Sequence, residues 1–122
     1  MIFKKVIFIY LNDKHMMMIQ WIFLILAGIF EIGWALALKM SNGFQNILMS
    51  IVTIILMIVS LIFLSLAIKD IPMGTAYAIW TGIGAVGVSI AGIILFGEPK
   101  TFFRIFCIVV IVGGIVGLKL SS

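Results

Sequence analysis

Glu31 is the residue whose type and position most clearly predict chemistry in this chain. It is the only acidic residue inside a long apolar segment, in the stretch AGIFEIGWALALK. A carboxylate at the middle of a bilayer costs roughly 3 kcal/mol or more unless it is protonated or paired. We therefore expect Glu31 to bind a proton or a cation at the centre of a functional site.

Aromatic residues accompany this acid at helical spacing. Trp34 lies three positions after Glu31, so the two share a helix face, and Tyr77 and Trp80 have the same spacing. Aromatic rings around a carboxylate suit an organic cation, because a ring face attracts a desolvated cation by up to roughly 2 kcal/mol. A guanidinium fits especially well, since its paired N–H groups match a carboxylate in a two-pronged geometry. Ordinary helix packing is the alternative interpretation of Trp34 and Trp80.

Small residues can complete or pack this site. Ser60 interrupts an apolar run, and its hydroxyl can either join the site or bond to a carbonyl one turn earlier in its own helix. Gly28, three positions before Glu31, allows another group to approach closely. The glycine-rich stretch 82–87 predicts either a soft point where a helix bends or close helix packing.

The composition places these residues in a membrane. The chain is 65% hydrophobic and 10% charged, which is more apolar surface than a soluble domain of 122 residues can bury. The uncharged runs exceed the roughly 20 residues that cross a bilayer, and they lack the alternation of barrel strands. We expect an all-α, four-helix membrane bundle in a single domain, residues 18–122. The predicted spans are about Ile19–Leu38, Ile47–Ile68, Gly74–Phe96 and Thr101–Leu118.

Residues 1–17 form an N-terminal extension before the first span. Lys4 and Lys5 precede an apolar stretch that is short for a signal peptide, and no small-residue cleavage site follows it. Translation from Met16, Met17 or Met18 is an alternative to the start at Met1. Otherwise we expect the extension to lie along the membrane surface. His15 has no second ligand nearby, so we interpret it as a solvated residue and expect no metal site.

The basic residues at the two ends of the bundle give little orientation bias. Without the extension, one side carries Lys69 and Lys119, and the other carries Lys39, Lys100 and Arg104. The positive-inside rule then barely selects a direction. With the extension, three further lysines favour an N-terminus inside the cell: Lys4, Lys5 and Lys14.

A chain that inserts both ways can pair with an inverted copy of itself. Such an antiparallel homodimer recreates the inverted symmetry common in transporters and places two Glu31 carboxylates in one chamber. Gly113 and Gly117 in the fourth span have a small-xxx-small spacing that favours close packing of helices. We expect this surface to form the dimer contact.

From about Met18 onward, the chain resembles the small multidrug resistance family of proton-coupled exporters. The segments that carry the resemblance are AGIFEIGWALALKMSNGF, IPMGTAYAIWTGIGAVG, GIILFGEP and GIVGLK. Trp34 is similar to the guanidinium-exporter branch, whereas the quaternary-ammonium branch typically has a small or hydroxylated residue there. The resemblance implies that Glu31 is the shared proton and substrate site. It implies a substrate site lined by Trp34, Ser60, Tyr77 and Trp80, with Ser60 bonding toward the carboxylate, and an antiparallel dimer.

These observations predict a proton-coupled antiporter that exports guanidinium, and small substituted guanidinium cations, across the cytoplasmic membrane by alternating access. No covalent step is needed, so we expect a transporter rather than an enzyme, without a cofactor and without a nucleic-acid partner. Two alternatives stay open: a polyspecific exporter of quaternary ammonium cations, and a non-transporting subunit that modulates a partner. A heterodimer with a paralogous chain is a further possibility, because the extension can fix one orientation.

Overall fold

The computed structural model describes the backbone of residues 1–121 and the side chains of residues 1–9 and 17–121. It contains four helices: α1 (Ile2–Met40), α2 (Ile47–Ala67), α3 (Met73–Phe96) and α4 (Phe102–Ser121). Each has a segment long and apolar enough to cross a bilayer, beginning at Met17 in α1, and no strand occurs within residues 1–121. The predicted all-α, four-helix membrane fold is confirmed, and the predicted spans agree closely with these segments.

Turn-forming residues set the ends of the helices. The α1–α2 connection reverses at Asn42 and Gly43, whose φ angles of 51° and 68° are left-handed. Asn46 then caps α2 by accepting a hydrogen bond from the Met49 N–H at 3.1 Å. Helix α3 ends at Gly97 with a φ of 64°, a conformation that glycine commonly supplies at helix C-termini. These short connections make consecutive helices antiparallel.

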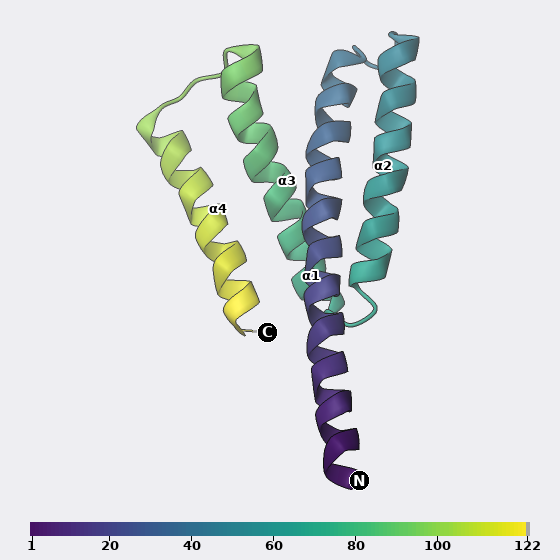
Figure 1. The fold of residues 1–122 in the computed structure, drawn as a ribbon. Coiled ribbons are helices and arrows are strands. Elements are labelled where there is room, and N and C mark those ends of the chain that lie inside the picture. Colours follow the sequence, from purple (N-terminus) through teal and green to yellow (C-terminus); the bar gives the residue numbers. More distant parts are fainter. Residues whose placement is uncertain (122) are drawn as a thin grey trace.

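Helix α1 is central to the packing. It lies against both α2 and α3, while α4 packs on α3 (Figure 1). The buried core is near the α2–α3 connection and consists of Leu24, Ala27, Ala67, Ile71, Ala76, Ile79 and Trp80. No residue of α4 is buried. Any site built on α1 therefore has walls from α2 and α3, and the outer face of α4 faces lipid or a second chain.

Helix α1 is much longer than the predicted first span, because the extension continues the same helix. Its 39 residues extend about 58 Å, against a hydrocarbon core of about 30 Å. Neither glycine nor proline occurs before Gly28, so nothing in the local sequence ends the helix earlier. The extension projects past the bundle (Figure 1), and its expected position along the membrane surface stays a prediction. The side chains of Lys14, His15 and Met16 lie outside the described residues.

Candidate functional site

The carboxylate of Glu31 lies between α1 and α3, against Gly84. A Cβ at Gly84 would collide with Oε2 and with the carboxyl carbon of Glu31, so this approach requires a residue without a side chain. Oε2 is buried and has no hydrogen-bond partner among the described residues. Buried polar atoms are nearly always paired, so an unpaired one at membrane depth indicates a site for a proton or a cationic group.

Trp34 follows Glu31 by about one turn of α1, and it too has a buried polar atom. Its side chain is partly buried. Its Nε1 is enclosed and lacks a hydrogen-bond partner within the part of the chain that the structure describes. The N–H donor of Trp34 is therefore buried and unpaired among the described residues, as is Oε2 of Glu31.

Ser60, Trp80 and the carbonyl of Ala27 form a buried polar cluster that joins three helices. The Ser60 hydroxyl of α2 donates to the Ala27 oxygen at 2.7 Å. Trp80 Nε1 of α3 donates to Ser60 Oγ at 3.0 Å and to the Ala27 oxygen at 3.2 Å. Ser60 is fully buried and Trp80 is 8% exposed. Since Ala27 precedes Glu31 by one turn, the cluster fixes α2 and α3 against the stretch of α1 that carries the acid.

This cluster differs from the expected role of Ser60. The resemblance implied that Ser60 bonds toward the Glu31 carboxylate. A serine hydroxyl has only one hydrogen to donate, and here Ala27 receives it. The alternative, a bond to a carbonyl of its own helix, is not observed for Ser60 either. Sequence spacing could not identify Ala27, because its side chain carries no polar group and its carbonyl is reached only through the tertiary packing.

Tyr77 forms the outer edge of the same group. Its ring centroid lies 5.5 Å from that of Trp80 with the planes inclined at 58°. The Tyr77 side chain is 52% exposed. The structure therefore brings Ser60, Tyr77 and Trp80 together one turn from Glu31. No hydrogen bond or ring contact within the described residues joins Trp34 to them.

Glycines make these close helix contacts possible. Ile83 occupies the space beside Gly28, where a Cβ would lie 2.6 Å from Ile83 Cγ2. Ile32 lies still more tightly against Gly87, and α3 runs without a break through the glycine-rich stretch. Close packing, and not a break in the helix, is thus what these glycines provide here. Gly84 was not distinguished from its neighbours in the sequence, because only the packing shows which glycine faces the acid.

A pocket lies between α1 and α3 at the end of the bundle that carries the α3–α4 connection, and Glu31 is not among its lining residues. Its volume is about 90 Å³, and it is lined by Ala35, Leu36, Lys39, Val88, Gly92, Phe96 and Glu98. Ala35 and Lys39 follow Glu31 at intervals of four along α1, and Val88 and Gly92 follow Gly84 in the same way along α3. Residues four apart share a helix face, so the pocket and the acid lie on one seam between the two helices.

The Gly84→Ala substitution tests whether the contact of the Glu31 carboxylate with Gly84 is needed for guanidinium binding. We expect at least a tenfold loss of guanidinium binding, because the added methyl group occupies the position of the Glu31 carboxylate and displaces it. Alanine itself favours a helix by about 1 kcal/mol over glycine. Isothermal titration with guanidinium and thermal unfolding in detergent measure the two effects. Gly114→Ala is the matched control, since no atom lies within 4 Å of its Cβ position. Equal binding by both variants would contradict the prediction.

Comparisons with known proteins identify the family. The family described as Small Multidrug Resistance protein matches residues 19–111. The chain belongs to the small multidrug resistance family. It is 55% identical over 103 residues to a protein of Proteus vulgaris named guanidinium exporter, a match that covers 84% of this chain and 99% of that protein. Proteins of the same name from Salmonella typhimurium strain LT2 and Escherichia coli strain K12 are 52% and 50% identical, each match covering 84% of this chain and 98% of the relative.

Family membership settles the broad class of the chain. It is a multi-pass cell-membrane protein of a transporter family, as the four apolar helices and the resemblance predicted. The family match begins at Ile19, so the N-terminal extension lies outside it.

Proposed function

We propose that this chain exports guanidinium and small substituted guanidinium cations across the cytoplasmic membrane in exchange for protons. The observation that carries the proposal is the buried, unpaired carboxylate oxygen of Glu31, set among helices with no other acid at that depth. The relatives named guanidinium exporters support the choice of cation. A planar cation with paired N–H donors would satisfy this carboxylate in a two-pronged geometry.

Protons and guanidinium compete for the Glu31 carboxylate, and this competition couples their transport. Glu31 can hold a proton or a guanidinium but not both, so the arrival of one releases the other. The side chain of Trp34 supplies a ring face one turn away that attracts the flat cation. The Ser60–Trp80 cluster acts as a positioning element, because it holds the three helices against the turn that precedes Glu31. Tyr77 lines the outer side of this group.

Transport further requires that Glu31 open to each face of the membrane in turn. We propose that two copies pair antiparallel, so that the two carboxylates share one chamber and bind protons as a coupled pair. The pocket beside Lys39 and Glu98 supports a path from one face toward the acid. In the inverted copy, the same pocket would lead to the opposite face. Exchange of the two copies between these states would give alternating access.

Reconstituted flux tests this function directly. Purified chain in proteoliposomes with an imposed pH gradient should accumulate radiolabelled guanidinium and show little uptake of tetraethylammonium. Comparable uptake of both cations would favour a polyspecific exporter. Flux of neither cation from the purified chain would favour a subunit that only modulates a partner.

The Trp34→Ala substitution distinguishes a substrate-binding indole from a packing residue. Loss of a ring worth up to roughly 2 kcal/mol should reduce the preference for guanidinium over tetraethylammonium about tenfold or more, with a smaller effect on stability. Competition binding and thermal unfolding provide the two readings. Trp21→Ala is the matched control, because the Trp21 ring lies under Lys119 at 5.3 Å, at the end of the bundle. Parallel losses of preference and stability in Trp34→Ala would indicate packing alone.

A further inference from the structure

Polar side-chain contacts mark the depth at which the N-terminal extension (residues 1–17) leaves the four-helix bundle. Gln20 Nε2 of α1 donates to Asp70 Oδ2 of the α2–α3 connection at 2.8 Å. Beside it, the Lys119 ammonium group of α4 lies 5.3 Å from the centre of the Trp21 ring. Charged and amphipathic side chains of this kind mark the membrane–water boundary. Gln20 is also the first buried residue along the described part of α1. The helix therefore enters the bilayer near residues 17–21.

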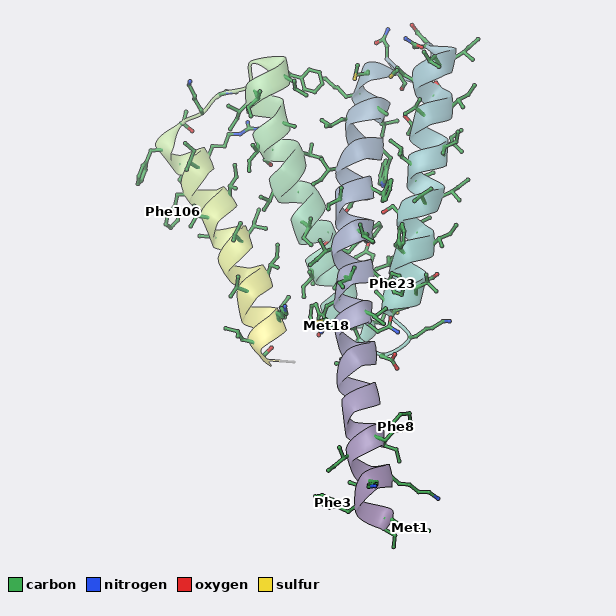
Figure 2. The ribbon with its side chains drawn as sticks, in the orientation of Figure 1. Met1, Phe3, Phe8, Met18, Phe23 and Phe106 are labelled. Atoms are coloured by element: carbon green, nitrogen blue, oxygen red, sulfur yellow. The ribbon has the colours of Figure 1, made fainter. Side chains whose placement is uncertain are left out.

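Beyond this level, the extension exposes apolar side chains. Residues 2–16 extend about 22 Å as a helix. Phe3 and Phe8 are 75% and 70% exposed, and Ile2 and Ile9 are 80% and 58% exposed. Figure 2 shows Phe3 and Phe8 on the part of α1 that no other helix accompanies. A group of exposed apolar side chains of this size indicates a site of interaction with another molecule or with a membrane.

The bilayer surface is the occupant that fits this segment. Membrane-spanning α1 holds the extension permanently at the interface, so its apolar residues reach the headgroup region without any separate binding step. Lys4 and Lys5 add attraction to anionic lipid. A second copy fits less well, because in an antiparallel pair the two extensions emerge on opposite faces of the membrane. Here the inference rests on the proposed function, which supplies the antiparallel arrangement.

We propose that the N-terminal extension bends at the bilayer surface, lies on the anionic inner leaflet and holds this end of the chain inside the cell. The polar run Asn12–His15 separates the apolar residues of the extension from the first span. Helix α1 is continuous through this run in the structure, so the proposal requires the helix to bend there at the bilayer surface, which keeps polar groups in water while Phe3 and Phe8 enter the headgroup region.

The extension also reverses the charge bias of the chain. With the extension, the N-terminal side of the bundle carries five lysines: Lys4, Lys5, Lys14, Lys69 and Lys119. The other side carries three basic residues: Lys39, Lys100 and Arg104. Without the extension, the N-terminal side carries only two lysines, and the other side carries the same three basic residues. The positive-inside rule therefore favours an N-terminus inside the cell for a copy with the extension and barely selects a direction for a copy without it. One antiparallel pair can thus be assembled from a long copy, held with its N-terminus inside the cell, and a short copy, which can insert the other way.

Topology in cells tests the orientation. A single cysteine at position 121, in a Cys107→Ser background, reports the side on which the C-terminus lies through a membrane-impermeant maleimide. The full chain should be protected in most copies. A chain that begins at Met17 should be labelled in about half of its copies, and Lys4→Gln with Lys5→Gln should give labelling between that of the full chain and that of the short chain. Lys39→Gln with Lys100→Gln is the matched control and should increase protection. Identical labelling of all four would overturn the proposal.

Depth measurement tests the surface position. A nitroxide attached to Phe8→Cys, in the Cys107→Ser background, should show headgroup-level accessibility to oxygen and a nickel chelate in vesicles that contain phosphatidylglycerol. Lys4→Gln with Lys5→Gln should shift it toward water. Full aqueous accessibility of the label in the unsubstituted chain would overturn the proposal. Spin–spin coupling that grows with the protein-to-lipid ratio would also overturn it, by showing a second copy as the occupant. Neither test measures guanidinium flux, so a failure of the surface proposal can be distinguished from a failure of the proposed function.

Discussion

We expect Glu31→Gln to abolish proton-driven guanidinium accumulation while the four-helix fold persists. Glutamine has nearly the shape of glutamate, so it fits the space that Gly84 leaves beside α3. It carries no charge and releases no proton in the working range. Two charge-assisted hydrogen bonds, each worth about 1.5–3 kcal/mol, are lost with the carboxylate. Guanidinium binding should therefore weaken by about 100-fold or more, and no proton can be exchanged for the cation.

Two measurements on reconstituted and detergent-solubilised protein examine this expectation. Uptake of radiolabelled guanidinium under a pH gradient should fall to the level of empty vesicles. Addition of guanidinium to weakly buffered protein should release protons from the unsubstituted chain and none from the variant. Asp70→Asn is the matched control, since Asp70 is an exposed acid of the α2–α3 connection, away from Glu31 and from the pocket. Accumulation by Glu31→Gln against a gradient would refute the proposed role.

Glu31→Asp separates charge from geometry. The shorter side chain keeps the carboxylate but withdraws it from Gly84. We expect transport to persist with a changed pH profile. An inactive Glu31→Asp variant that still releases protons on guanidinium binding would show that the exact position of the carboxylate also controls the opening of the site.

The sequence predicted the fold well because membrane insertion imposes simple rules. Long uncharged runs must be helices in lipid, and the four predicted spans agree closely with the apolar helical segments of the structure. The N-terminal extension was harder, because the proposed surface position depends on a bilayer, whereas the helical state depends only on local propensity. Local propensity alone continues the helix through residues that lack glycine and proline.

The candidate site was predictable only in part. Glu31 and its aromatic neighbours stood out because such residues are costly or unusual at membrane depth. The contact of the carboxylate with Gly84 and the hydrogen bond from Ser60 to Ala27 depend on how α2 and α3 are rotated against α1. Spacing within one helix shows which residues share a face. It does not show which face of the next helix they meet.

The second large effect concerns Gly113 and Gly117, which we expect to form the dimer contact. Ile111 and Ile115 of α4 pack toward Gly82 of α3. At about 100° per residue, Gly113 and Gly117 lie on the opposite face of α4, and no atom lies within 4 Å of their Cβ positions. A small-xxx-small surface on the outer side of the last helix suits close approach of a second chain. Figure 2 likewise shows Phe106 of α4 pointing away from the bundle.

Leucine at both glycines should prevent this approach and thereby remove transport. Loss of backbone contact along one helix pair should weaken dimerisation by at least about tenfold, which corresponds to about 1.4 kcal/mol. Förster transfer between differently labelled copies in vesicles, measured over a range of protein-to-lipid ratios, gives the dissociation constant, and guanidinium uptake gives the activity. Val112→Leu is the matched control, because Val112 is exposed on α4 about a third of a turn from the glycine face. If the double substitution leaves dimerisation unchanged, the contact lies on another face. If dimers are lost but full uptake remains, a single copy completes the transport cycle, and the shared chamber of two carboxylates is ruled out.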